Sequence, residues 1–230
     1  MPGFIKPSES IKVKTHLGSR LEKRVELIDL IRDMAAAIKR VDGRRPQAAN
    51  ARTGVVYQPG FGPHPETRAV ELVESELIEL DPVRYAQRLK LGVPYPGGRQ
   101  KCDLCIGTSP EWEWVVEIKM LRLMGDNGKP NDNMLMHILS PYPSDRSALT
   151  DCLKLAESGL PGRKAVVIYG FDYPNLPMDP AVDAFEILAR QWVRFSDRVV
   201  GVYSDLIHPV HRMGRVFGWE ISVLSALRES

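Results

Sequence analysis

Residues 115–121 read Val-Val-Glu-Ile-Lys-Met-Leu, a short apolar run that carries two charges. An apolar run of this length predicts a β-strand. Side chains of a strand alternate between its two faces, so Glu117 and Lys119 share one face and Ile118 points to the other. Charged groups on an apolar strand are costly to bury unless each finds a partner. The run therefore predicts a polar site on one face of this strand.

A second carboxylate, Asp103, lies upstream in the segment 101–106, Lys-Cys-Asp-Leu-Cys-Ile. The residues between the two segments, 107–110, are Gly-Thr-Ser-Pro, which is typical of a turn. The sequence therefore predicts a hairpin whose second strand covers about 112–123. This hairpin would place Asp103 and Glu117 on adjacent strands.

These residue types suit the hydrolysis of a phosphodiester, which needs an activated water and stabilisation of added negative charge. Mg²⁺ supplies both, and it prefers a few carboxylate oxygens while it keeps several waters. Asp103 and Glu117 could supply those oxygens, and the backbone carbonyl of Ile118 could add another. Lys119 could hold or activate the attacking water.

The rest of the chain predicts an α/β fold. The order strand, helix, strand after the hairpin requires a crossover connection and therefore a mixed sheet flanked by helices. The expected helices cover about 19–41, 65–80, 145–158 and 180–194, and the further strands about 164–170, 198–204 and 217–224. The segment 44–65 is expected to be a long loop, because Pro and Gly interrupt it.

Helix starts have recognisable signals here. Ser19 with Glu22 predicts a capping box, and Ser144 predicts the N-cap of the third helix. In the second helix Glu66 lies in the direction of the apolar residues, so it either interacts with the helix dipole or belongs to a site. The other acidic residues of that helix are expected to point elsewhere: Glu71, Glu74, Glu76 and Glu79.

The pattern Asp103, a thirteen-residue gap, then Glu117-Ile118-Lys119 resembles the PD-(D/E)XK nuclease superfamily, which has the restriction-endonuclease-like fold. The order of elements is also similar over about residues 64–172: a helix bearing an acid, the hairpin, a helix and a further strand. Cys102 stands where the family name has proline, a position that varies in the superfamily.

This resemblance implies metal-dependent cleavage of nucleic-acid phosphodiester bonds, usually of DNA, as in restriction, defence and repair enzymes. It implies that Asp103 and Glu117 are metal ligands, that Lys119 is the catalytic lysine and that Glu66 joins the metal site. The implied cofactor is Mg²⁺, for which Mn²⁺ could substitute. Cutting both strands of a duplex needs two active sites, so a homodimer is expected.

The charge of +2 is unevenly distributed, because residues 1–60 hold twelve Lys and Arg but six acidic residues. We expect a basic N-terminal helical extension (1–60) joined to a nuclease-like α/β domain (61–230). The basic segment is compatible with contact to a phosphate backbone, and equally with a solvated helix face. A non-catalytic nucleic-acid-binding or protein-interaction module on the same fold is the alternative function. The candidate nucleic-acid contacts are Arg44, Arg45, Arg99, Gln100 and Lys154.

Composition limits the remaining classes. The 230 residues are 43% hydrophobic, and they include no apolar run of the roughly 20 residues that span a bilayer. The start of the chain lacks the apolar stretch of a signal peptide, so a cytoplasmic protein without membrane contact is expected.

Three cysteines argue against a disulfide framework. Cys102 and Cys105 form a CxxC, which leaves a zinc or redox protein open, although buried small residues are the favoured interpretation. A metal site of Asp205, His208 and His211 is disfavoured, because Pro209 interrupts the spacing. His137 is expected in the core, on a strand near 134–139.

Overall fold

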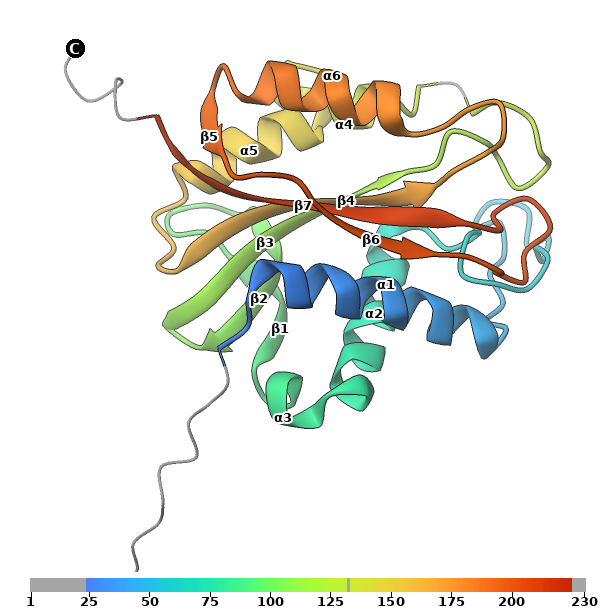
Figure 1. The fold of residues 1–230 in the computed structure, drawn as a ribbon, viewed down its shortest axis with the longest axis horizontal. Coiled ribbons are helices and arrows are strands. Elements are labelled where there is room, and N and C mark those ends of the chain that lie inside the picture. Colours follow the sequence, from blue (N-terminus) through green and yellow to red (C-terminus); the bar gives the residue numbers. More distant parts are fainter. Residues whose placement is uncertain (1–23, 132, 225–230) are drawn as a thin grey trace, which may run out of the picture.

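A computed structural model describes residues 24–131 and 133–224. Its centre is a seven-stranded sheet in the order β1-β2-β3-β4-β7-β5, with β6 also pairing with β7 (Figure 1). The strands are β1 (Leu89–Pro94), β2 (Lys101–Thr108), β3 (Glu111–Leu121), β4 (Arg163–Phe171), β5 (Val193–Phe195), β6 (Val199–Tyr203) and β7 (Gly214–Val223). The helices are α1 (Leu27–Gly43), α2 (Glu66–Leu80), α3 (Pro82–Tyr85), α4 (Met136–Leu139), α5 (Ala148–Ala156), α6 (Asp179–Ala189) and the 3₁₀ turn Pro143–Asp145.

The expected mixed sheet is confirmed. β2 and β3 form the antiparallel hairpin, and β3 runs parallel to β4. Parallel neighbours need a crossover, and α4 and α5 lie in the connection between β3 and β4. Residues 66–171 therefore form two helices (α2 and α3), three antiparallel strands, a crossover and a strand parallel to β3.

Helices cover both faces of the sheet: α1 and α2 lie on one side and α4, α5 and α6 on the other (Figure 1). Even-numbered residues of β3, such as Val116 and Ile118, pack in the core that contains Ile31 of α1. Gly201 of β6 lets α1 lie close to the sheet, since a Cβ at this position would lie 2.7 Å from the Ile31 carbonyl oxygen. Val115 packs in the opposite core with α5 and α6. Alternation along β3 is therefore as predicted.

The first helix begins later than predicted. Residues 24–26 precede it, and Glu26 has an extended backbone with φ −90° and ψ 153°. The reason is a contact with the sheet: the Val25 N–H donates to Glu113, and the Trp114 indole donates to the Val25 carbonyl at 2.8 Å. The predicted capping box of Ser19 and Glu22 lies outside the described residues.

The N-cap of α5 is Ser147 and not Ser144, which lies in the 3₁₀ turn. Ser147 Oγ accepts a hydrogen bond from the Thr150 N–H at 3.1 Å and donates to the Ser140 carbonyl at 2.5 Å. The prediction of Ser144 was wrong because both serines have the right chemistry, and tertiary contact selects the buried one.

We expect Ser147→Ala to lower the free energy of unfolding by about 1–2 kcal/mol, because it removes the cap of α5. Ser144→Ala is the matched control, and this exposed substitution should change stability by less than about 0.5 kcal/mol. Urea titrations followed by circular dichroism measure both. Equal effects of the two variants would contradict the assignment of the cap.

Two other predictions were wrong. His137 is exposed on the short helix α4, because residues 133–135 form a turn and the chain then continues as a helix rather than a strand. Glu76 is buried, because it forms ion pairs with Arg40 at 2.5 Å and Arg44 at 2.6 Å where α2 lies against α1. Within residues 24–131 and 133–224, no helix combines the length and apolarity needed to cross a membrane.

Candidate active site

The site forms where β2 and β3 separate. β2 pairs with β3 from Leu104 onward, whereas Lys101 and Cys102 pair only with β1. Beyond this point β3 continues beside β4 alone, so its edge toward β2 is left with unpaired backbone groups. A strand edge of this kind needs other hydrogen-bond partners when it is buried.

Two carboxylates supply those partners. Asp103 Oδ2 accepts the Ile118 N–H at 2.8 Å, and Glu66 Oε2 accepts the Met120 N–H at 2.7 Å. The N–H and C=O of one strand residue point to the same side, so the Ile118 carbonyl also faces this gap. The edge of β3 therefore brings together Asp103 of β2, Glu66 of α2 and the Ile118 backbone.

An open cavity of about 670 Å³ lies over this gap. Asp103, Glu117, Lys119 and Glu66 line it, and α5 forms its opposite wall. The full lining is Glu66, Arg99, Gln100, Lys101, Asp103, Glu117, Lys119, Pro141, Pro143, Arg146, Thr150, Asp151, Leu153 and Lys154. Its volume falls within the range of small-molecule sites, and its open side suits part of a larger substrate.

Ion pairs cross from β3 to α5 inside the cavity. Lys119 Nζ lies 3.0 Å from Asp151 Oδ2 and 3.7 Å from Glu66 Oε1. Lys154 Nζ lies 3.0 Å from Glu117 Oε1 and 2.6 Å from Asp151 Oδ1. Each lysine thus pairs with an acid of the other element, and Asp151 holds both. Asp151 has no place in the predicted site, since nothing local in the sequence distinguishes it from a solvated helix residue.

Behind the exposed Arg99, Lys101 and Arg146 at its border, the interior of the cavity holds four acids and only two lysines. Burial, with Asp103 and Asp151 nearby, raises the pKa of Glu117 to about 9, although Lys154 opposes the shift. Burial also raises the pKa of Glu66, against the opposing effect of Lys119. Burial alone would lower the pKa of Lys119, but the neighbouring carboxylates outweigh it and the net shift is upward. A cation bound among these acids would relieve the repulsion.

The donor set fits a hard divalent cation. Oxygen ligands are what Mg²⁺ prefers, and it binds through one or two carboxylates while keeping several waters. In the described part of the chain, hydrogen bonds engage Asp103 Oδ2 and Glu117 Oε1 but not the second oxygen of either carboxylate. These second oxygens, with the Ile118 carbonyl, could hold the ion, and Glu66 lies at the same gap.

The chain matches no family model, no curated protein and no solved structure. The function must therefore be argued from the cavity itself.

The predicted nucleic-acid contacts fall into two groups. Arg99 and Gln100 are exposed at the cavity, and Lys154 lies inside it with its ammonium already paired. Arg44 and Arg45 are not among the lining residues. Arg44 instead pairs with Glu76 and Glu79 on α2, which gives it a structural role that its position in a long loop did not reveal.

The thiol hypothesis gains no support. Cys102, Cys105 and Cys152 are free and buried. Cys102 Sγ donates to the Val116 carbonyl at 3.1 Å, and burial and its neighbour Cys105 raise the pKa of its thiol. Among the residues described, neither Cys102 nor Cys105 belongs to a group of three or more metal-ligand side chains.

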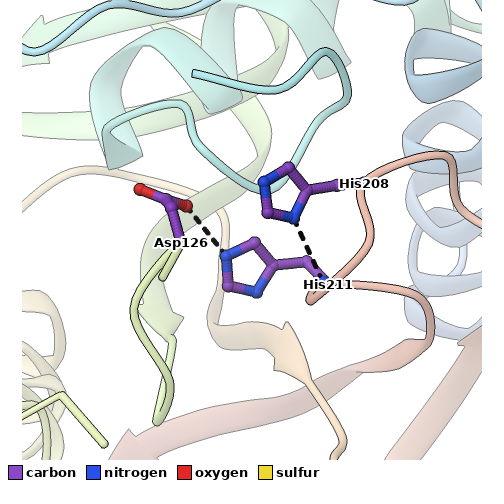
Figure 2. A group of neighbouring side chains, drawn as sticks. All are labelled: Asp126, His208 and His211. Atoms are coloured by element: carbon purple, nitrogen blue, oxygen red, sulfur yellow. Dashed lines mark hydrogen bonds and ion pairs between the residues drawn. The ribbon is translucent and has the colours of Figure 1, made fainter. Parts of the chain in front are cut away.

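A different cluster does bring three such side chains together. Ligand atoms of Asp126, His208 and His211 all lie within 4.8 Å of one another (Figure 2). His208 and His211 come from the loop between β6 and β7, and Asp126 from the loop after β3 (Figure 2). Asp205, the acid considered from sequence, is instead exposed and pairs with Lys39 at 3.4 Å. Sequence missed Asp126 because it lies far away in the chain.

Hydrogen bonds make this cluster a poor metal centre. His208 Nδ1 accepts the N–H groups of Val210 at 3.2 Å and His211 at 3.3 Å, so the proton of the neutral ring lies on Nε2. His211 bridges Tyr173 at 2.8 Å and Asp126 at 2.9 Å with its two ring nitrogens. A ligand nitrogen must be unprotonated, and Nε2 of His208 is not. The cluster therefore ties two loops together.

Stability should fall in acid because of His208. Burial, with His211 nearby, lowers the pKa of this ring from 6.5 to about 4. A depressed pKa means that the neutral ring stabilises the fold above pH 6.5 and that this contribution is lost as the pH falls toward 4. His208→Asn keeps an acceptor for the turn and should flatten the pH dependence of unfolding between pH 6.5 and 4. His137→Asn, at an exposed position, should leave this pH dependence unchanged. If the free energy of unfolding varied equally with pH in the unaltered protein and both variants, the role of His208 would be refuted.

Proposed function

We propose that this protein is a Mg²⁺-dependent nuclease that hydrolyses phosphodiester bonds in DNA. One observation carries the proposal. The carboxylates of Asp103 and Glu66 accept backbone N–H groups at the edge of β3, and the side chains of Glu117 and Lys119 line the same cavity. The order of helix, hairpin, crossover and parallel strand around this cavity also agrees with the resemblance to the PD-(D/E)XK superfamily.

Bound Mg²⁺ would polarise the scissile phosphate and lower the pKa of a bound water. The chain's own residues divide the remaining work. Asp103 and Glu117 would hold the ion, and the Ile118 carbonyl would supply a further oxygen ligand. Lys119, fixed between Asp151 and Glu66, holds the attacking water and offsets the charge that develops on the phosphate.

The border of the cavity suits a nucleic-acid backbone. Arg99, Gln100 and Arg146 are exposed lining residues, whereas the acids lie deeper. Positive groups around an acidic centre would hold flanking phosphates while the scissile phosphate reaches the metal. A duplex cut on both strands would engage two copies of the site, which is the basis for proposing a homodimer.

The test is a cleavage assay with the purified full-length protein. Supercoiled plasmid, linear duplex and single-stranded DNA should be incubated with Mg²⁺, with Mn²⁺ and with EDTA. We expect cleavage with either metal and none with EDTA. Absence of cleavage with all three substrates would refute the proposal, and salt-sensitive DNA binding in that case would support the non-catalytic binding module instead.

A further inference from the structure

The ammonium group of Lys154 lies between two buried carboxylates. It contacts Glu117 Oε1 at 3.0 Å and Asp151 Oδ1 at 2.6 Å, and both side chains are 5% exposed or less. The ring of Tyr95 lies 5.4 Å from the same nitrogen, and the Tyr95 hydroxyl donates to Glu117 Oε1. Lys154 therefore occupies a cation position made of two carboxyl oxygens and an aromatic ring.

The fold holds Lys154 in this position. Asp151 and Lys154 are three residues apart on α5, so they share one side of the helix. Leu149 and Leu155 of α5 are buried in the core and anchor the helix, and Ser147 caps its first turn. Lys119 takes the other oxygen of Asp151, which leaves Oδ1 to Lys154. An ammonium paired this closely with buried acids is part of the site rather than a mobile surface charge.

The charges of the cavity interior explain what this lysine does. Apart from the exposed Arg99, Lys101 and Arg146 at the border, four carboxylates (Glu66, Asp103, Glu117, Asp151) face two ammonium groups (Lys119, Lys154). When all six are ionised the formal charge is −2, which one divalent cation neutralises. Without Lys154 the charge would be −3, and both Glu117 Oε1 and Asp151 Oδ1 would lack their ammonium partner.

We propose that the Lys154 ammonium is a built-in cation that restricts this site to one divalent metal ion. This inference rests on the proposed function, because it assumes that the acids of the cavity bind a metal. Lys154 covers the oxygens that a second ion would need, and it leaves Glu117 Oε2, Asp103 Oδ1 and the Ile118 carbonyl for the first. It is thus a positioning residue for Glu117, and phosphate binding falls to the exposed residues Arg99 and Arg146.

Metal stoichiometry tests this directly and does not depend on cleavage. Equilibrium dialysis of the full-length protein against Mn²⁺, with metal analysis and electron paramagnetic resonance, should give one bound ion per chain. Lys154→Met should bind two ions, and coupling between the two Mn²⁺ should broaden its spectrum. Lys154→Arg, which keeps the cation, and Lys90→Met, which removes an exposed charge on β1, should both bind one.

A charge-restoring variant guards against an indirect effect. Lys154→Met leaves Glu117 Oε1 and Asp151 Oδ1 without their ammonium partner. Combining it with Asp151→Asn removes the negative charge of Asp151, and this double variant should again bind one Mn²⁺ per chain. Circular dichroism and thermal melts should show that all variants are folded. Two ions in the unaltered protein, or one ion in a folded Lys154→Met variant, would overturn the inference.

The outcomes also separate this inference from the proposed function. One ion in the unaltered protein and two in Lys154→Met, without cleavage of any DNA, would sustain the role of Lys154 and refute the nuclease. No bound Mn²⁺ in any variant would refute both.

Discussion

Asp103→Asn is expected to reduce DNA cleavage by at least about 100-fold while the fold stays intact. Asparagine keeps an oxygen that can accept the Ile118 N–H, so the edge of β3 remains satisfied. It removes the negative charge that would hold Mg²⁺, and a catalytic metal contributes several kcal/mol to transition-state stabilisation. Initial rates on supercoiled plasmid across a range of Mg²⁺ concentrations measure the effect.

The control is Asp197→Asn, which changes the same chemical groups at an exposed position away from the cavity. It should cleave at the rate of the unaltered protein. Unchanged cleavage by Asp103→Asn would contradict the proposed site, because Asp103 is one of its two proposed carboxylate ligands.

What the sequence could predict was local. The alternation in 115–121, the turn at 107–110 and the glycine-bounded strand near 164–170 each carry their signal within a few residues, and each element was found. The hairpin alone predicted that Asp103 and Glu117 would lie on adjacent strands. This is why the central residues of the candidate site could be brought together before the structure was known.

The partners that complete the site could not be predicted in this way. Asp151 becomes the shared partner of two lysines only because α5 packs across β3 after a crossover. The pair of Glu76 and Arg44 is a second case: the two residues come together, and Glu76 becomes buried, only because α1 and α2 meet. Pairing between distant elements depends on the packing of the whole domain, for which hydrophobic periodicity carries no signal.

Asp42 connects such distant pairing to the candidate site. This residue ends α1, is 1% exposed, and accepts the Phe61 N–H at 2.8 Å and the Ile207 N–H at 2.6 Å. The loop that contains Phe61 leads directly into Glu66 at the start of α2. Gly60 fits against this carboxylate with φ +137°, and a Cβ there would lie 2.9 Å from Asp42 Oδ1. One buried carboxylate thus fixes the loop from which the acidic helix starts.

We expect Asp42→Ala to lower the free energy of unfolding by about 3 kcal/mol, because it leaves two backbone N–H groups without their acceptor. For a domain of this size the melting temperature should fall by roughly 10 °C. Asp42→Asn retains one acceptor oxygen and should lose less, whereas Asp197→Ala should have little effect. Below the melting temperature, Asp42→Ala should also cleave more slowly, because the start of α2 is no longer held against β3. A melting temperature equal to that of the unaltered protein would contradict this role of Asp42.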